Sequence, residues 1–181
     1  MPERIVLTGF MGAGKTTSGV RLARELGWSF IDLDEEIVRA EQKSVAFIFE
    51  SAGENSFREL EHLALRSALR QRNIVLALGG GAIETAANRQ LLIDDIHTLL
   101  IYLESPLDVL IDRCEHQQSL QSEAARRPVL EKRSELTTRF LRRQPLYESA
   151  HWTIETSGRT AEEVARAIFT RWQEQVMGQS I

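Results

Sequence analysis

The stretch GFMGAGKT at residues 9–16 has the residue types and the spacing of a loop that binds phosphate groups. Its glycines let the backbone come close to an anion, so that successive N–H groups can point at phosphate oxygens. Lys15 adds a mobile positive charge for the β and γ phosphates, and the hydroxyl of Thr16 is suited to bind Mg²⁺. These residues indicate a site for the phosphates of a nucleotide.

The elements around this loop are those that a phosphate loop needs. Residues 5–8 form a short apolar run typical of a buried strand, and Leu22, Ala23 and Leu26 recur at helical spacing until Gly27. A glycine-rich turn that matches by chance is the alternative. The order of strand, loop and helix favours the phosphate loop.

Two carboxylates at the end of the second apolar run are the next candidates for chemistry. Along an extended strand, Asp32 and Asp34 would share one side and Leu33 would face the other. The ordinary interpretation is a strand end and a helix N-cap before Glu35. Beside a phosphate loop, a catalytic interpretation is favoured, in which one acid helps to hold Mg²⁺ and the other accepts a proton from an attacking hydroxyl. Because no aspartate ends the third apolar run, Asp32 is the candidate for the metal.

Five short apolar runs alternate with stretches of helical periodicity along the chain. This alternation is typical of an α/β protein, with a parallel sheet covered by helices on both faces and ligands beyond the carboxyl ends of the strands. The length is that of one ordinary domain, so residues 1–181 are expected to form a single domain. The expected strands are residues 5–8, 30–33, 74–78, 99–103 and 152–155.

A long helix is expected to begin at a capping box, Ser51 with Glu54, and to continue to Arg72. Arg58 and Glu61 lie three residues apart on this helix, beside the stripe that we expect to be buried. As a surface ion pair they would contribute only about 0.2–0.5 kcal/mol. That ordinary interpretation stays open at this point. The expected buried stripe consists of Phe57, Leu60, Ala64 and Ala68.

Three consecutive glycines, Gly79, Gly80 and Gly81, follow the third apolar run. Each glycine weakens regular structure by roughly 0.5–1 kcal/mol relative to alanine, so we expect another group to approach the backbone there. A flexible turn is the alternative.

The arginines matter because an acidic chain must concentrate them locally to hold an anionic substrate. A helix that starts near Pro106 is expected to end at Arg113, and the polar residues 115–125 are the best candidate for a mobile lid. Solvated helix faces are the alternative explanation for the clusters. The clustered arginines are Arg126, Arg127, Arg142 and Arg143.

The composition excludes several classes of partner. A net charge of −4 argues against a general electrostatic attraction to nucleic acid. The longest apolar run, near residues 74–83, is too short to cross a bilayer, and no apolar targeting segment precedes residue 5, so no membrane partner is expected. The single cysteine, Cys114, excludes an internal disulfide and fits a reducing compartment. We expect a cytoplasmic monomer.

Most of these features occur in the same order in shikimate kinase, which this chain resembles over nearly its whole length. The phosphate loop is common to many proteins, whereas the aspartate pair, the Phe-Arg-x-x-Glu helix and the triple glycine are specific. The features that carry the resemblance are residues 9–17 with Gly19, Asp32-Leu33-Asp34, Ser44 with Ile48-Phe49, Gly53-Glu54, Phe57-Arg58 with Glu61, Gly79-Gly80-Gly81, Arg127-Pro128 and Arg143-Gln144-Pro145-Leu146-Tyr147.

The resemblance implies a fold and an activity. The fold would be the three-layer αβα P-loop fold of nucleoside monophosphate kinases, with a central five-stranded parallel sheet. Residues of about 32–61 would bind the substrate, and a mobile lid at about 115–127 would close on ATP. The activity would be the Mg²⁺-dependent transfer of the γ-phosphoryl group of ATP to the 3-hydroxyl of shikimate, in the pathway to chorismate and the aromatic amino acids.

The resemblance also assigns residues at the reacting end of the site. Asp34 would bind the 3-hydroxyl and act as the base, while Lys15 and Arg127 would complete the catalytic set at the phosphates. Thr16 would bind Mg²⁺ directly and Asp32 through water. Of the doublet at 126–127, Arg127 is preferred because it precedes Pro128. The implied ATP-binding residues are Gly12, Ala13, Gly14, Lys15, Thr16, Thr17, Arg113, which would stack on adenine, and Arg127.

The implied substrate site centres on two arginines. Arg58 and Arg143 would hold the carboxylate of shikimate, because planar guanidinium groups suit bidentate binding of a carboxylate. Glu61 would support Arg58. The backbone at Gly80 and Gly81 would approach the ring, and Asp34 would complete the set.

Two other functions remain as alternatives. A kinase for a nucleoside monophosphate or gluconate would keep the phosphate loop, but the region from 32 to 61 offers no obvious pair of aromatic residues for stacking a base. A guanine-nucleotide switch should carry an Asn-Lys-x-Asp stretch, which none of Asn55, Asn73 and Asn88 begins. ATP consumption that depends on added shikimate would distinguish the three.

Overall fold

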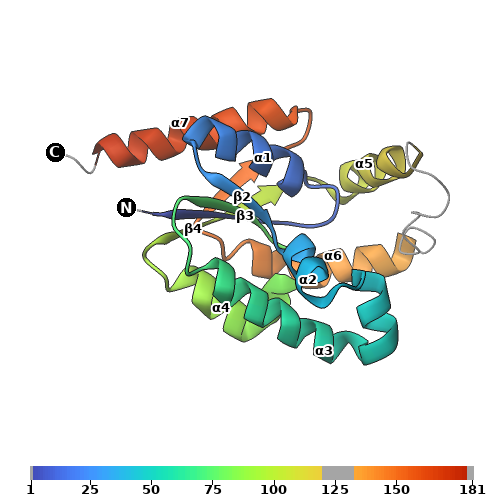
Figure 1. Cartoon of the computed structure of the whole chain (residues 1–181). Helices are drawn as coiled ribbons and strands as arrows, with labels where there is room; N and C mark the ends of the chain where they lie inside the picture. Colours follow the sequence, from blue (N-terminus) through green and yellow to red (C-terminus); the bar gives the residue numbers. More distant parts are fainter. Residues whose placement is uncertain (1, 120–132, 179–181) are drawn as a thin grey trace.

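The computed structural model describes residues 2–119 and 133–178, and Figure 1 shows the arrangement of its helices and strands. The strands are β1 (Arg4–Thr8), β2 (Ser29–Asp32), β3 (Ile74–Ala77), β4 (Thr98–Glu104) and β5 (Trp152–Glu155). The helices are α1 (Lys15–Leu26), α2 (Leu33–Glu41), α3 (Val45–Ala68), the 3₁₀ helix η1 (Ala82–Glu84), α4 (Ala86–Ile93), α5 (Leu107–Ser119), α6 (Arg133–Tyr147) and α7 (Ala161–Gly178).

The five strands form one parallel sheet in the order β2-β3-β1-β4-β5. Figure 1 shows α1 and α7 on one face of this sheet, and α3 and α4 on the other. The expected α/β architecture with a central five-stranded parallel sheet and helices on both faces is confirmed. Strand β1 is central, and all five of its residues are buried.

The strand order places the phosphate loop at the point where ligands bind in sheets of this kind. The chain leaves β1 and reaches β2 and β3 on one side of it, whereas β4 and β5 lie on the other side. Open α/β sheets bind ligands at the carboxyl ends of the strands, beside the position where the strand order reverses. The loop that follows β1 lies at this position.

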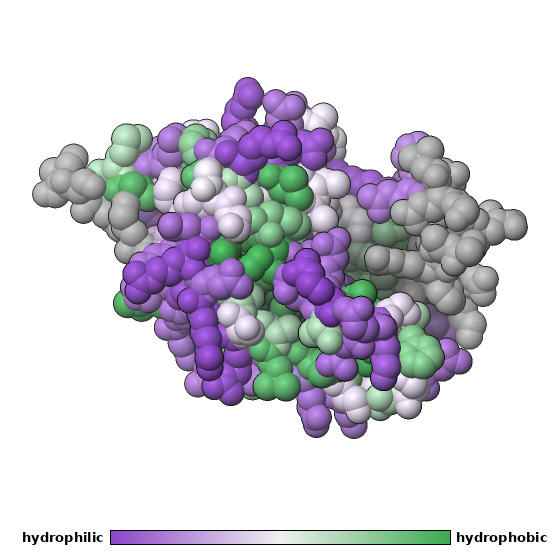
Figure 2. All heavy atoms as spheres, in the orientation of Figure 1, coloured by the Kyte–Doolittle hydropathy of each residue, from purple (hydrophilic) through white to green (hydrophobic). Residues whose placement is uncertain are grey.

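Most large apolar side chains lie in the core between the layers. Among the described residues, the exposed large hydrophobic side chains belong to α1, α2, α3, α6, α7 and the turn before β4. Figure 2 shows hydrophilic side chains over the rim of one face and hydrophobic atoms chiefly near its middle. No helix in the two described ranges has the length and apolar character needed to cross a membrane.

The region after β2 differs from the expected extended pair of aspartates. Strand β2 ends at Asp32, and Asp34 lies in the first turn of α2. Asp32 is the N-cap of that helix, since its Oδ1 accepts a hydrogen bond from the backbone N–H of Asp34 at 3.1 Å. A short polar side chain can accept a hydrogen bond from the backbone N–H two residues later, and such a bond favours the start of a helix. For this reason the chain turns into α2 at Leu33, and Asp34 is not part of an extended strand.

The long helix α3 also begins earlier than expected. Its N-cap is Ser44, whose Oγ accepts from the backbone N–H of Phe47 at 3.2 Å. The hydroxyl of Ser51 instead donates to the carbonyl of Phe47, so the predicted capping box at Ser51 is wrong. The break lies at Gly53, whose φ of 81° interrupts the helix, and α3 ends at Ala68 instead of Arg72.

Helix α5 is longer than predicted, because it continues past Arg113 to Ser119. The first part of the expected lid, residues 115–119, therefore belongs to a helix. The rest of the expected lid, residues 120–127, lies outside the described residues, and so do Arg126 and Arg127.

Candidate active site

The phosphate loop joins the end of β1 to the start of α1. Gly12 and Gly14 have φ angles of 76° and 86°, which other residues rarely adopt. A Cβ atom at Gly12 would also lie 2.5 Å from the carbonyl oxygen of Leu110. The loop conformation therefore requires glycine at these positions, and Gly14 leads directly into the N-terminus of α1, where unpaired N–H groups favour an anion.

Lys15 is the first residue of α1, and its ammonium group lies over the loop. Its Nζ donates to the carbonyl oxygens of Gly9 at 2.8 Å and Phe10 at 3.0 Å. Phe10 attaches the loop to the core, since its side chain is buried and packs edge-on against Phe140 with the ring centroids 5.4 Å apart. The charge expected to meet the phosphates is thus held at a fixed place beside the loop.

Thr16 and Asp32 lie together, as the sequence predicted for a metal site. The hydroxyl of Thr16 donates to Oδ2 of Asp32 at 2.8 Å. A hydroxyl and a carboxylate are the hard oxygen donors that Mg²⁺ prefers, and Mg²⁺ is usually held by one or two such groups together with substrate phosphates and water. The donor set therefore fits Mg²⁺. Within the described residues, no group of three or more His, Cys, Asp or Glu side chains forms a separate metal cluster.

A cavity of about 410 Å³ lies beside the phosphate loop, between α1, α5 and the turn after β5. Arg113 crosses its wall, where its guanidinium donates to the backbone oxygen of Thr156, to the hydroxyl of Thr156 at 3.0 Å and to the carbonyl of Gly12 at 3.4 Å. The residues lining this cavity include Gly12, Ala13, Gly14, Thr17, Arg113, His116, Thr156 and Arg159.

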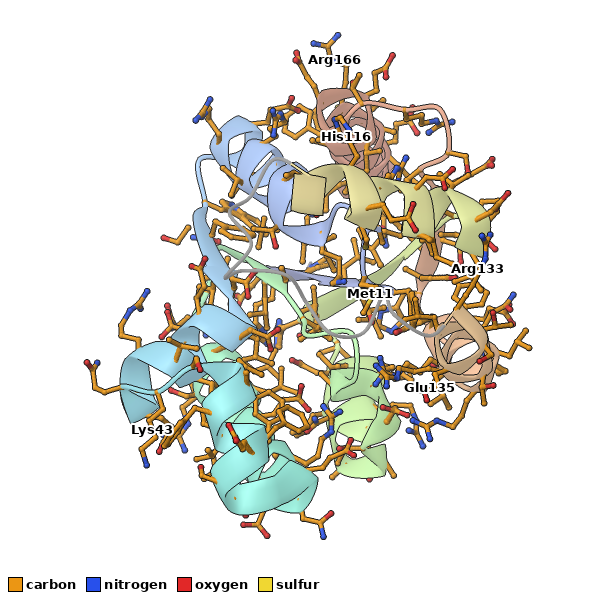
Figure 3. The ribbon with its side chains drawn as sticks, turned by 90° about the vertical axis from the view of Figure 1, so that its right-hand side faces the viewer. Met11, Lys43, His116, Arg133, Glu135 and Arg166 are labelled. Atoms are coloured by element: carbon orange, nitrogen blue, oxygen red, sulfur yellow. The ribbon has the colours of Figure 1, made fainter. Side chains whose placement is uncertain are left out.

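A second cavity of about 680 Å³ lies between α3 and α6. Figure 3 looks onto this end of the molecule, with Met11 of the phosphate loop near the centre. His116, from the first cavity, lies above Met11, and Glu135, from the second, lies below it. The residues lining the second cavity are Phe49, Glu54, Arg58, Ser134, Glu135, Thr138, Arg139, Arg142 and Arg143.

Gly80 connects the two halves of the site. A Cβ atom here would lie 3.6 Å from Nη1 of Arg143, 3.7 Å from the carbonyl oxygen of Gly9 and 3.9 Å from the backbone nitrogen of Met11. The carbonyl of Gly80 also accepts a hydrogen bond of 2.5 Å from the phenol of Tyr147. The arginine side of the second cavity thus directly adjoins the phosphate loop.

The other two glycines make room for charged side chains. A Cβ atom at Gly79 would lie 2.6 Å from Oδ1 of Asp34 and 3.2 Å from Oε1 of Glu61. A Cβ atom at Gly81 would lie 2.4 Å from Nη2 of Arg58. The expectation that another group approaches this backbone is confirmed. Side chains of the protein itself, from α2 and α3, make the approach.

Glu61 and Arg58 form a buried pair. Glu61 is fully buried, and its Oε2 accepts from Nη1 of Arg58 at 2.8 Å, so the surface ion pair is excluded. Within the described part of the chain, Oε1 of Glu61 has no hydrogen-bond partner. Burial raises the pKa of Glu61 to about 7, although the charge of Arg58 acts to lower it. The buried stripe of α3 includes Glu61 and Leu65, while Leu60 and Ala64 are only half-buried.

Sequence reasoning missed Glu84, the last residue of η1. Its Oε2 lies 2.7 Å from Nη2 of Arg143 and 3.8 Å from Nη2 of Arg58, and its Oε1 lies 2.5 Å from Nη2 of Arg142. Burial alone would raise the pKa of Glu84, but the hydrogen bond and charge of Arg143, with the charges of Arg142 and Arg58, hold it below its ordinary value. The available signals in the sequence were a glutamate three residues after the triple glycine and the Arg142-Arg143 doublet in a distant helix. Neither signal specifies which residues come into contact.

Most of the expected site residues lie in this one region. The phosphate loop, Thr16 and Asp32 lie at one end, and Asp34 shares the space above Gly79 with Glu61. Arg58 and Arg143 both face the second cavity. Arg127 is the expected site residue that falls outside the described residues.

The sheet order and the phosphate loop define the class of this protein, an αβα P-loop kinase. The family model for shikimate kinase matches residues 11–173, and the chain belongs to the shikimate kinase family. The shikimate kinase of Salinibacter ruber is 36% identical over 178 residues, which cover 92% of this chain and 83% of that protein. The shikimate kinase of Bordetella avium is 39% identical over 173 residues, covering 93% and 78%.

Solved structures give the same result. The structure of shikimate kinase from Acinetobacter baumannii in complex with shikimate is 36% identical, with a TM-score of 0.84, and the match covers 97% of this chain and 95% of that one. A gluconokinase structure from Sinorhizobium meliloti matches with a TM-score of 0.65 at 20% identity. At that identity the likeness concerns the fold alone.

Proposed function

We propose that this protein transfers the γ-phosphoryl group of ATP to the 3-hydroxyl of shikimate, as a step in the pathway to chorismate. The observation that carries the proposal is the position of Arg143, which lines the second cavity and lies beside Gly80, next to the phosphate loop. A ligand whose carboxylate meets the arginines can therefore present its ring to the phosphate loop. The match to a shikimate kinase crystallised with shikimate supports the same acceptor.

The nucleotide would occupy the first cavity with its phosphates on the loop. Backbone N–H groups of residues 12–17 and the ammonium of Lys15 bind the phosphates, while Arg113 lies in the wall where adenine is expected. Thr16 and Asp32 would hold Mg²⁺, with Asp32 acting through water. When bound, the metal neutralises charge on the phosphates during transfer.

Asp34 would orient the 3-hydroxyl and accept its proton. The N-cap bond from Asp32 fixes the backbone of Asp34 at the start of α2, and Asp32 is itself joined to Thr16 beside the phosphate loop. One connected set of contacts would therefore position the base relative to the phosphates. Holding the two reactants in this way is a large part of catalysis in phosphoryl transfer.

Arg58 and Arg143 would bind the carboxylate of shikimate. Arg58 is held at its place by Glu61, and the missing side chains at Gly80 and Gly81 let the two guanidinium groups lie close to this backbone, where the ring would bind. Two guanidinium groups on different helices fix both the position and the orientation of a carboxylate.

Several expectations remain part of the proposal. Arg127 would reach the phosphates from the lid. The 181 residues would act as one domain, and as a monomer in the cytoplasm.

The test is ADP formation by the purified protein with ATP and Mg²⁺, measured with and without shikimate. We expect turnover only with shikimate, and ADP formation should stay at background level with gluconate, AMP or no acceptor. Equal turnover with and without shikimate would favour a nucleotide switch. Turnover with gluconate or AMP alone would assign a different acceptor.

A further inference from the structure

The carboxylate of Glu84 already occupies the arginine pair to which the proposed function assigns the carboxylate of shikimate. Its Oε2 is 2.7 Å from Arg143 and 3.8 Å from Arg58, and its Oε1 contacts Arg142. The backbone around Glu84 is fixed, since its N–H donates to Gly81 and its carbonyl accepts from Arg89. The side chain is 18% exposed, whereas that of Glu61 is fully buried, and its partners Arg58, Arg142 and Arg143 all line the second cavity.

Carboxylates already surround the arginine pair. Among the described residues, Glu54, Glu61 and Glu84 form ion pairs with the guanidinium groups of Arg58, Arg142 and Arg143. A fourth carboxylate from the substrate would stand beside like charges if all three stayed in place, which disfavours binding.

Of these three acids, Glu84 is the one whose side chain can move away from the substrate arginines. Glu61 is fully buried and cannot withdraw into water, and Glu54 pairs with Arg58 from an exposed position. Of the described ion pairs, those of Glu84 include both substrate arginines. Its third partner, Arg142, is 64% exposed, and it offers Glu84 a counter-charge at the rim of the cavity.

We propose that Glu84 is an internal competitor of the substrate, whose carboxylate must leave Arg58 and Arg143 before the carboxylate of shikimate can bind. This inference rests on the proposed function and adds a residue that sets the affinity for the acceptor. Two consequences follow. First, the apparent affinity for shikimate equals the intrinsic affinity multiplied by the fraction of molecules in which Glu84 has left the arginine pair. Second, this reduction concerns only ligands that carry a carboxylate.

The experiment compares wild type with Glu84→Gln and Glu84→Ala. The dissociation constant of shikimate is measured by calorimetric titration, and KM and kcat by ADP formation. If Glu84 occupies the pair in most molecules, both variants should bind shikimate roughly three- to tenfold more tightly, with a matching fall in KM and an unchanged KM for ATP. Glu54→Gln is the matched control, since it removes one negative charge from Arg58 without touching Arg143. Its effect should be smaller.

A second ligand tests the mechanism. In an analogue of shikimate the carboxylate is replaced by a hydroxymethyl group, and the affinity gain from Glu84→Gln should disappear with it. Unchanged or weaker shikimate binding in both folded variants would overturn the inference, and would make Glu84 a support for Arg143. If Gln unfolds the protein, Ala provides the comparison. Wild type without shikimate-dependent turnover would instead overturn the proposed function, and the inference with it.

Discussion

The side chains of Thr16 and Asp32 are joined by a hydrogen bond of 2.8 Å, which links the phosphate loop's helix to the start of α2. The other oxygen of Asp32 accepts from the backbone N–H of Asp34 at 3.1 Å. Asp32 is therefore the N-cap of α2 as well as the residue proposed to act on the metal through water, whereas Asp34 lies inside the first turn of that helix. Because the two aspartates occupy different positions and have different proposed roles, each can be tested by its own substitution.

Asp34→Asn should reduce kcat by about 10² to 10⁴, because the amide lacks the charge and basicity needed to take a proton from the hydroxyl. ATP binding should survive, and shikimate should bind more weakly because its hydroxyl loses a charged partner. The measurements are kcat, KM for both substrates and urea denaturation. A stable variant with full activity would rule out the catalytic role.

Asp32→Asn is the matched control for that variant. Asparagine caps helices as well as aspartate does, so the fold should be retained. The expected change is a higher Mg²⁺ concentration at half-maximal activity, with little change in KM for shikimate.

Lys15→Ala should lower turnover by at least about 10²-fold, the scale expected for removing one preorganised charge. The fold should remain, since the side chain of Lys15 is not part of the apolar core and its Nζ donates to two carbonyls of the phosphate loop itself. Near-normal turnover in a variant with an unchanged urea midpoint would remove Lys15 from the mechanism.

Arg58→Lys and Arg143→Lys should each raise KM for shikimate by roughly tenfold or more, because a point charge cannot replace a planar fork and loses charged hydrogen bonds. KM for ATP should change much less. Steady-state kinetics with each substrate varied in turn gives both values. If both KM values rose equally, the arginines would serve the phosphates or the fold.

Gly81→Ala should raise KM for shikimate by acting on Arg58. The φ of −103° at Gly81 is compatible with alanine, but the new Cβ would lie 2.4 Å from Nη2 of Arg58. The end of a long side chain can move, so the guanidinium should be displaced, and stability should also fall because buried Glu61 then loses contact with its partner. Because the two changes act through one group, the variant that combines Gly81→Ala with Arg58→Lys should be little worse than Arg58→Lys alone. Fully additive effects would show that Gly81 acts independently.

Glu61 should make stability depend on pH. Its pKa is raised by burial from 4.5 to about 7, so the folded protein binds more protons than the unfolded chain between these values. The contribution of Glu61 to the free energy of unfolding is therefore full below about pH 4.5 and lost as the pH rises through about 7. Urea denaturation of wild type and Glu61→Gln from about pH 5 to about pH 8 measures it. The stability of wild type relative to the variant should fall over this range, and a constant difference would contradict the shift.

The sequence by itself determined the phosphate loop, the five strands and the order of the elements. These features are local, since a loop of fixed spacing and short apolar runs need no knowledge of distant residues. The resemblance to shikimate kinase assigned Asp32 to the metal and Arg58, Glu61 and Arg143 to the acceptor, and the structure brings these residues to one region. The boundaries at Asp34, Ser51 and Arg113 were wrong because caps and turns compete with the regular pattern.

Only the tertiary structure decided how the charges are arranged. A spacing of three residues fits both a surface pair and a buried pair for Arg58 and Glu61, and the packing of α3 against the glycine strand end selects the buried one. Glu84 meets Arg143 across 59 residues, and no local pattern encodes that contact. Burial and long-range pairing depend on the complete packing of helices on the sheet, and these two effects set the pKa values and the competition at the proposed carboxylate site.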